Sequence, residues 1–459
     1  MGVALVVYGL AVSPILRTPY VSDDTINSLA WANAHFESDG TYWTYTELWI
    51  RGWWTNHGRF FPLSYIHGYA IFWVFPSVVA YKVIQFAYAI VAALSFAVML
   101  RQMRVGARTT ALAVLAVTAT TSFVHARDGL LGFGALMPFL LTQLFLSLAA
   151  FAAWQRTRRR LLLGVSLVLF IAASLTYESA HLVGLMFVAV ALAGGRRLRD
   201  ALRAAAPFLV VMVAGIALGL WGRHRAGGGG EYAATPELGA AVTTFAKQLF
   251  TTLPLTATGA VDAAANLGPW ALGLGLLAAA VTVWIIVRTG DPVRPAGPAP
   301  TPAAGARRAW ALPVGGLVWC ALMAGPIALT ARYQVELTWH EGHVQTYAQY
   351  FGFGLIVAAL AALVARALGR RAGAAVMALV IAAGTATAAQ RNLDWVRGVA
   401  PERDARAAAE RALRDGLVAE VPPDGVVLDT MIPTPWLSPP AFYYQYARRP
   451  VAAQRPTVA

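Results

Sequence analysis

Cysteine and lysine are almost absent from this chain of 459 residues. The single cysteine, Cys320, lies inside an apolar run, which excludes a disulfide framework and a cysteine metal site. The lysines are Lys82 and Lys247, and we interpret this scarcity as a high-GC coding bias. Charged residues make up only 13% of the chain and hydrophobic residues 58%. With a mean hydropathy of +0.57, this composition excludes a soluble globular protein.

Apolar runs long enough to cross a bilayer recur along nearly the whole chain. They are rich in Leu, Ala and Val without alternation, so they predict helices rather than a closed barrel. The predicted fold class is an all-α polytopic membrane protein with about 11 transmembrane helices. The predicted spans are residues 2–16, 78–100, 109–125, 133–154, 161–177, 180–195, 206–221, 268–288, 309–330, 347–366 and 373–389.

The net charge of +14 would indicate nucleic-acid binding in a soluble protein. Here the arginines gather in short clusters between apolar runs, so we interpret them as topology signals and expect no nucleic-acid partner. If all the clusters are cytoplasmic, the spans between them come in pairs, with the N-terminus inside and the C-terminus outside. The clusters lie at residues 101–108, 156–160, 196–203, 288–308 and 366–371.

Residues 1–399 are predicted to form the transmembrane domain, with a first external loop at 17–61. Residues 62–76 are apolar, but a full span here would move every arginine cluster outside, so we interpret them as an interfacial or re-entrant helix. The first span lacks preceding basic residues and could be a truncated start or a signal-like segment. Residues 400–459 are predicted to form a small extracytoplasmic tail, with a helix at 402–415 and a strand at 425–428.

An acidic pair, Asp23 and Asp24, follows the first apolar segment. A structural explanation is available, because Ser22 could cap a short helix and acids in its first turn complement the helix dipole. The alternative is chemical: adjacent carboxylates raise one another's pKa, and an acceptor hydroxyl that attacks a substrate needs a base of suitable pKa. The pair is therefore a candidate for the catalytic site.

Arg59 precedes the predicted interfacial helix. It could be an ordinary snorkelling residue, but a guanidinium at the headgroup level also matches the oxygens of a phosphate. We favour phosphate binding, a role that Arg51, His57 and His67 nearby could share.

Glu178 follows Tyr177 at the end of the fifth predicted span, with His181 three residues further on. A carboxylate at membrane depth is costly and usually faces a partner or a cavity. Close to the membrane boundary a plain turn between two spans is the structural alternative. We favour a functional role for both residues.

A later external loop contains Arg332, Glu336, His340, Glu341 and His343. The spacing departs from the HExxH zinc signature by one residue, so it is weak evidence for a metal. Arg332 is assigned to donor phosphate binding, and His340, Glu341 and His343 to the acceptor or the cavity. Arg127 and Asp128 lie in a short loop. We expect them either to form a local ion pair or to line the acceptor cavity.

An acidic pair soon after the first helix, a Gly-Arg-x-x-Pro element before an interfacial helix, many spans and a small external tail together resemble the GT-C class of membrane glycosyltransferases. The residues that carry the resemblance are Asp23-Asp24, Gly58-Arg59-Phe60-Phe61-Pro62 and Tyr177-Glu178. Within that class the chain is similar to bacterial polyprenyl-phosphate-sugar-dependent enzymes, including those that resemble the O-antigen and teichoic-acid-modifying glucosyltransferases.

This resemblance implies transfer of a sugar from a polyprenyl-phosphate donor to a cell-envelope glycan or lipid at the outer face of the cytoplasmic (inner) membrane. It implies that Asp23 or Asp24 is the general base of an inverting displacement, and that Arg59 and Arg332 stabilise the departing phosphate. In agreement, the sequence has no Gly-rich phosphate loop and no DxD-type inside loop. Some members of the class bind a divalent metal; no complete ligand set can be named here, so a metal stays possible and no other cofactor is expected.

Two other functions stay open. A transporter or flippase for a lipid-linked sugar would place charged residues deep within several spans and would show internal repeats, and we find neither pattern. A surface-glycan polymerase or ligase would place paired arginines in a large late external loop, for which Arg223 and Arg225 are a weak match.

Overall fold

The computed structural model describes residues 1–123, 128–227, 232, 237–251, 260–288, 302–339, 342–419, 421, 426–428, 439–447 and 452–454. Within these residues the chain is almost entirely helical. Seven helices are long and apolar enough to cross a membrane, and four shorter stretches of apolar helix accompany them. Together they correspond one to one with the eleven predicted spans, so the prediction of an all-α polytopic membrane protein is confirmed.

The long apolar helices are α6 (Val78–Gln102), α8 (Met137–Thr157), α11 (Leu198–Arg225), α14 (Pro269–Arg288), α15 (Pro302–Ala328), α17 (Thr346–Ala367) and α18 (Arg370–Gly398). The shorter ones are α1 (Gly2–Val12) with η1 (Ser13–Arg17), α7 (Ala107–Thr120), α9 (Arg160–Thr176), and η2 (Glu178–Val183) with α10 (Gly184–Ala193). Predicted ends were wrong by up to nine residues. For example, α11 begins eight residues earlier than predicted, because its charged first turns continue the helix beyond the apolar run.

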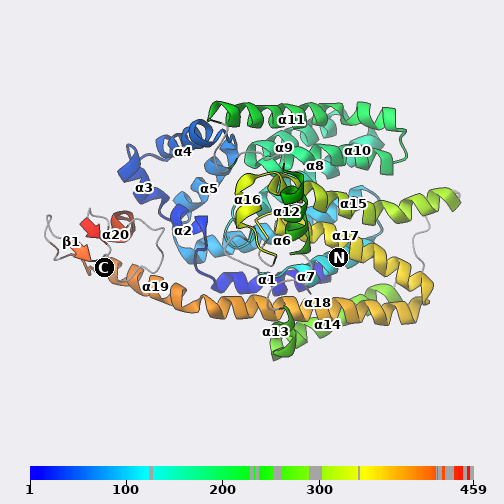
Figure 1. Cartoon of the computed structure of the whole chain (residues 1–459). Helices are drawn as coiled ribbons and strands as arrows, with labels where there is room; N and C mark the ends of the chain where they lie inside the picture. Colours follow the sequence, from blue (N-terminus) through cyan, green and yellow to red (C-terminus); the bar gives the residue numbers. More distant parts are fainter. Residues whose placement is uncertain are drawn as a thin grey trace.

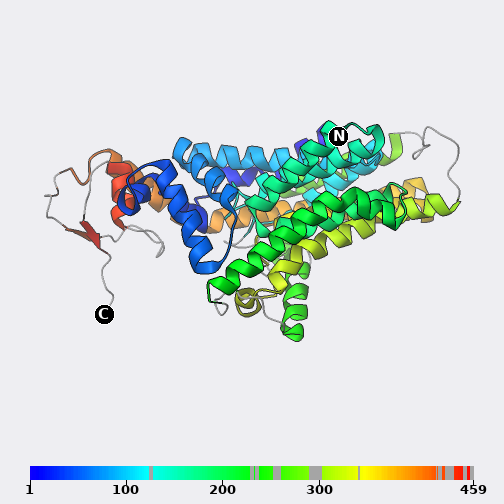
Figure 2. The same ribbon diagram turned by 90° about the horizontal axis from the view of Figure 1, so that it is seen from above.

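The long helices lie side by side along one direction, with the first external loop and the C-terminal tail together at one end (Figure 1). Figure 2, turned by 90°, shows the same separation. The connections α10–α11 and α17–α18 lie at the opposite end in both views. These connections contain or adjoin the arginine clusters at 196–203 and 366–371, so these two clusters and residues 17–61 occupy different ends of the bundle.

Small residues let the long helices approach closely, as they do in membrane proteins generally. Gly316 of α15 and Gly352 of α17 face one another, and a Cβ atom on Gly316 would lie 2.4 Å from the Gly352 carbonyl oxygen. Next to this contact, Phe145 packs between Trp319 and Phe351, with ring centroids 5.2 and 5.1 Å away. The bundle is therefore closely packed in its interior.

The predicted first external loop (17–61) is folded into three helices, α2 (Asp23–Asn27), α3 (Ala30–Glu37) and α4 (Tyr42–His57), and α5 (Pro62–Val74) follows it. Helix α5 matches the helix predicted at 62–76. It begins with Pro62, a residue that suits a first helical position because its missing N–H would have no partner there.

The other described elements are α12 (Leu238–Phe250), α13 (Ala260–Ala265) and α16 (Ala331–Glu336), followed in the tail by α19 (Ala400–Arg414), β1 (Val426–Leu428), α20 (Pro439–Ala447) and β2 (Ala452–Gln454). The tail helix and strand therefore occur where the sequence predicted them. The two strands pair in parallel, with Val426 opposite Ala452.

Candidate active site

The turn between α4 and α5 brings Arg59 to the end of α11. Helix α4 ends at His57 and is capped by Gly58, which has a left-handed backbone (φ 62°) and donates its N–H to the Trp54 carbonyl. Glycine is favoured at such a position because it has no Cβ. Here a Cβ would also lie 2.2 Å from the backbone nitrogen of Arg223. The close approach explains why the residue before Arg59 is glycine.

Glu178 lies between two arginines at this turn. One of its oxygens, Oε2, accepts hydrogen bonds from Arg59 Nε at 3.2 Å and from Arg223 Nη2 at 3.0 Å. Glu178 comes directly after Tyr177, whose extended backbone ends α9. The ends of α4, α9 and α11 are thus joined by one carboxylate. Its other oxygen, Oε1, is buried and has no hydrogen-bond partner among the described residues.

Tyr232 connects this cluster to two more of the predicted phosphate-binding residues. The Arg59 and Arg332 guanidinium carbons lie 4.7 and 5.3 Å from the centroid of its ring. Arg332 Nη1 also donates to the Tyr232 hydroxyl at 2.5 Å. The His57 ring lies 5.6 Å from the same ring, edge to face. The structure therefore brings Arg59, Arg332 and His57 together around one tyrosine.

Sequence reasoning missed Tyr232 and gave Arg223 only a weak role. Tyr232 follows a run of four glycines in the middle loop, and nothing in that pattern indicates a binding residue. Arg223 lies in the last turn of a long apolar helix, where arginine is common as a topology signal.

Two other residues considered for phosphate binding lie elsewhere. The Arg51 side chain is 76% exposed and forms an ion pair with Glu47 on the same helix. His67 stacks on Phe139, with ring centroids 3.7 Å apart, and burial lowers its pKa to about 4. A neutral, stacked imidazole of this kind is a packing residue at physiological pH.

Asp23 and Asp24 have different environments. Asp23 is exposed, whereas Asp24 is 3% exposed. The Tyr81 hydroxyl of α6 donates to Asp24 Oδ2. Burial raises the pKa of Asp24 to about 8, although the nearby Lys82 ammonium and the bond from Tyr81 oppose the rise. Of the two carboxyl groups, Asp23 is therefore the accessible one.

Lys82 extends the polar contacts of Asp24 into the bundle. Its Nζ donates to Gln85 Oε1 at 2.9 Å, and Gln85 Nε2 donates in turn to the Leu131 carbonyl oxygen at 3.2 Å. Asp24 is thus one end of a buried network that links α2 to α6 and to the turn before α8.

Tyr65 of α5 is affected by charges from both parts of the candidate site. Its hydroxyl is within electrostatic range of both the Asp23 carboxylate and the Arg59 guanidinium, and burial raises its pKa well above the ordinary value. Its ring also stacks on Phe61, with centroids 5.4 Å apart. Asp23 and Arg59 therefore both lie within electrostatic range of this half-buried tyrosine.

The remaining predicted site residues are not all near this cluster. His181 packs against Gly215 of α11, where a Cβ atom would lie 2.6 Å from its Nε2. His343 packs on Tyr333, with centroids 4.3 Å apart, and its Nδ1 lies 3.1 Å from Gln345 Oε1. Both histidines are buried, and His181 lies within electrostatic range of Glu178, so their assignment to the acceptor or cavity stays a prediction.

Asp128 is buried in a different place. Its Oδ1 accepts the backbone N–H groups of Leu130 at 2.6 Å and Leu131 at 3.3 Å, which closes a turn. The carboxylate lies within electrostatic range of Tyr350 and Arg391 inside the bundle. The predicted partner Arg127, and also His340 and Glu341, lie outside the described residues.

A metal site is not found among the described residues, where no three His, Cys, Asp or Glu side chains come together. Of the two histidines considered as metal ligands, His340 and His343, the first lies outside the described residues, so a divalent metal stays a prediction. What the described side chains do offer is three guanidinium groups, those of Arg59, Arg223 and Arg332, beside the two carboxylates of Glu178 and Glu336.

No known family model matches this sequence, and no curated protein is similar to it at a significant level. Among solved structures, the chain is similar to the crystal structure of ArnT from Cupriavidus metallidurans bound to undecaprenyl phosphate. The alignment covers 98% of this chain and 84% of that one, with 14% sequence identity and a TM-score of 0.42. A likeness of this size carries no functional conclusion, so the role of the site rests on its own contacts.

Proposed function

We propose that this chain is a membrane glycosyltransferase of the GT-C type, which transfers a sugar from a polyprenyl-phosphate donor to a cell-envelope glycan or lipid acceptor. The observation that carries the proposal is the convergence of Arg59, Arg332 and His57 around Tyr232, with the exposed Asp23 of α2 at the same end of the bundle. A phosphate-binding group and a general base are the two requirements of such a transfer, and both are available there.

The arginine cluster suits the phosphate of the donor. Guanidinium groups bind phosphate oxygens through paired N–H donors, and a buried cluster stabilises developing negative charge more strongly than water does. Glu178 keeps Arg59 and Arg223 together before the donor binds.

We assign the base to Asp23 rather than to its neighbour. Asp23 takes the proton of the acceptor hydroxyl, the acceptor oxygen attacks the anomeric carbon, and the bond from that carbon to the phosphate oxygen breaks. The electron pair leaves with polyprenyl phosphate, and the single displacement inverts the anomeric centre. Asp24 is buried and its Oδ2 already accepts the Tyr81 hydroxyl, so Asp23 is the carboxylate that an acceptor can reach.

The arginine clusters support an orientation. The clusters at 196–203 and 366–371 adjoin connections at the end of the bundle away from α2–α5, and Lys and Arg mark the cytoplasmic side of membrane proteins. We therefore place Asp23 and Arg59 at the outer face of the cytoplasmic membrane, where lipid-linked sugars are the appropriate donors.

The test uses the purified full chain in lipid nanodiscs with radiolabelled polyprenyl-phosphate sugars and an envelope glycan extract as acceptor. We expect label transfer with at least one donor, and a loss of about 100-fold or more in Asp23→Asn, as for removal of a general base. Asp39→Asn is the matched control, because Asp39 is an exposed carboxylate of the same loop. Equal activity in Asp23→Asn would disprove the base assignment.

A companion measurement addresses the rival functions. The same protein is reconstituted in vesicles that contain a fluorescent polyprenyl-phosphate sugar, and the movement of the lipid between leaflets is followed. Lipid movement without sugar transfer would replace the proposal with a flippase. Transfer of a preassembled oligosaccharide, but not of single sugars, would replace it with a glycan polymerase or ligase.

A further inference from the structure

The C-terminal tail contacts the chain on both sides of the short helix that carries the two aspartates. Helix α19 provides two arginines three residues apart, a spacing that places side chains on the same face of a helix. Arg403 Nη1 donates to the Arg17 carbonyl oxygen at 2.9 Å, and Arg406 Nη2 donates to Ser28 Oγ at 2.8 Å. Residues 18–27, which include all of α2, lie between these two contacts.

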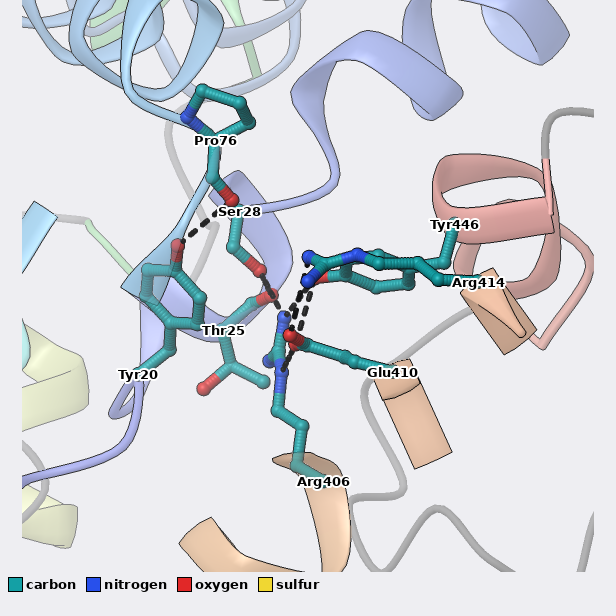
Figure 3. Close-up of polar contacts among 8 residues, drawn as sticks. All are labelled: Tyr20, Thr25, Ser28, Pro76, Arg406, Glu410, Arg414 and Tyr446. Carbon is teal, nitrogen blue, oxygen red and sulfur yellow. Dashed lines mark hydrogen bonds and ion pairs between the residues drawn. The ribbon is translucent and has the colours of Figure 1, made fainter. Parts of the chain in front are cut away.

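The Arg406 contact reaches the backbone of α2 itself. Ser28 Oγ accepts the bond from Arg406 and donates its own hydrogen to the Thr25 carbonyl oxygen at 2.6 Å. Figure 3 shows Arg406, Ser28 and Thr25 in this arrangement, with Tyr20 beside them. The Arg406 guanidinium carbon lies 4.6 Å from the centre of the Tyr20 ring, so it contacts the segments before and after the aspartates.

Arg406 is itself held in place by the tail. Its Nε donates to Glu410 Oε1 at 2.9 Å, and the Tyr446 hydroxyl of α20 donates to the same oxygen at 2.7 Å. The Arg406 and Glu410 side chains are about nine-tenths buried, at 10% and 9% exposed. A buried, hydrogen-bonded ion pair fixes the direction of the arginine more firmly than an exposed pair would.

A second part of the tail binds the helix after α2. The side chain of Gln445 in α20 accepts the backbone N–H of Ala32 at 3.1 Å. The Tyr444 ring stacks on His35 and on Trp31, with centroids 4.2 and 5.2 Å apart. Helix α3 is thus held by α20 while α2 is held by α19.

We propose that α19 and α20 form a clamp that fixes the position of α2, and that Arg406 is the positioning residue of Asp23. The proposal rests on the proposed function in one respect, which is the role of Asp23 as the base. The clamp itself is a claim about how firmly α2 is held, and it can be measured without any sugar donor.

The donor-free measurement is thiol labelling at position 22. The Ser22 side chain caps no helix N–H, so Ser22→Cys leaves the hydrogen bonds of α2 intact. The native Cys320 is buried and contributes little background. In this background we compare Arg406→Gln, Ser28→Ala and the conservative Arg406→Lys, with Arg411→Ala, an exposed arginine of the same helix, as the matched control.

We expect the labelling rate of the thiol introduced at position 22 to rise about tenfold in Arg406→Gln and in Ser28→Ala, as the loss of one charge-assisted hydrogen bond predicts. Arg406→Lys is expected to restore most of the protection, and Arg411→Ala to match the parent. Ser28→Ala removes the same contact without altering the tail, because it leaves the Arg406–Glu410 ion pair in place. Unchanged labelling in both Arg406→Gln and Ser28→Ala would overturn the clamp.

The activity measurement uses the same substitutions in the native chain. A positioning role predicts that kcat falls while KM for the polyprenyl donor stays within about twofold, because the arginine cluster is untouched. A rise in KM with unchanged kcat would overturn the positioning role. If labelling rises as expected but the native chain transfers no sugar, the clamp stands and the proposed function fails.

Discussion

The backbone of Gly58 lies directly against that of Gly222. A Cβ atom added to Gly58 would be 2.2 Å from the Gly222 carbonyl carbon, and one added to Gly222 would be 2.6 Å from the Gly58 carbonyl oxygen. Both contacts are to backbone, which cannot rotate away as a side chain can. This approach sets the distance between Arg59 and Arg223, the two arginines that share Glu178.

Gly58→Ala should therefore separate α4 from α11. The left-handed backbone alone costs about 1 kcal/mol for alanine, and the contact with Arg223 adds to that cost. We expect a lower melting temperature in detergent and a raised KM for the lipid donor. Gly52→Ala is the control, since nothing lies within 4 Å of a Cβ at that position of α4. Similar melting temperatures for both variants would argue against the close contact.

Glu178→Gln should destabilise the protein strongly. The substitution leaves Arg59 and Arg223 beside a neutral amide, and the Arg59 side chain is only 8% exposed. Removing one partner of a buried ion pair costs about 3–5 kcal/mol. Chemical unfolding in a mild detergent provides the measurement, with Glu47→Gln as the exposed counterpart, for which a change of under about 1 kcal/mol is expected. A small effect of Glu178→Gln would mean that the two arginines are not desolvated.

Asp24 should make the stability depend on pH. Its pKa is raised by burial from 3.8 to about 8, so the folded chain keeps a proton that the unfolded chain loses. Between pH 4 and pH 8 the unfolded state then binds fewer protons, and stability falls as the pH rises. We expect Asp24→Asn, a neutral group of the same shape, to flatten this slope in melting curves taken at steps across that range. An equal slope in the variant would show that other groups cause it.

Tyr232→Phe tests the centre of the arginine cluster. The substitution keeps the ring beside Arg59 but removes the hydroxyl that accepts from Arg332. A hydrogen bond to a charged group contributes about 1.5–3 kcal/mol. Without it Arg332 is no longer held in place for the phosphate, so we expect KM for the donor to rise about tenfold or more. Tyr444→Phe, in the tail, serves as the control. Unchanged donor binding in Tyr232→Phe would remove Arg332 from the phosphate site.

The membrane spans could be predicted because hydropathy is a property of neighbouring residues. The site could be predicted only in part, because its members come from segments far apart in the sequence. Arg59 and Glu178 could be recognised from the sequence because each is a charged residue beside a long apolar run. Tyr232 could not, because its role depends on which rings and arginines surround it in the fold.

The two aspartates show a second limit. Adjacent residues of a helix point about 100° apart, so both carboxyl groups could not face the same partner. The sequence treats the two residues as one pair, and only the packing of α2 against Tyr81 shows that Asp24 is the buried one. The docking of Arg406 on Ser28 was equally inaccessible to sequence reasoning, since 378 positions separate them.

A single residue, Val399, separates the last membrane helix α18 from the tail helix α19. Pro401 lacks the N–H that would continue the backbone hydrogen bonds of α18, so a new helix begins there. The two helices nevertheless follow one another closely (Figure 1). A long apolar helix changes its tilt when the surrounding hydrocarbon layer becomes thinner or thicker. Because one residue joins the two helices, a change in the tilt of α18 also moves α19, which contacts the chain on both sides of Asp23. We therefore expect the turnover rate to vary with the acyl-chain length of the host lipids.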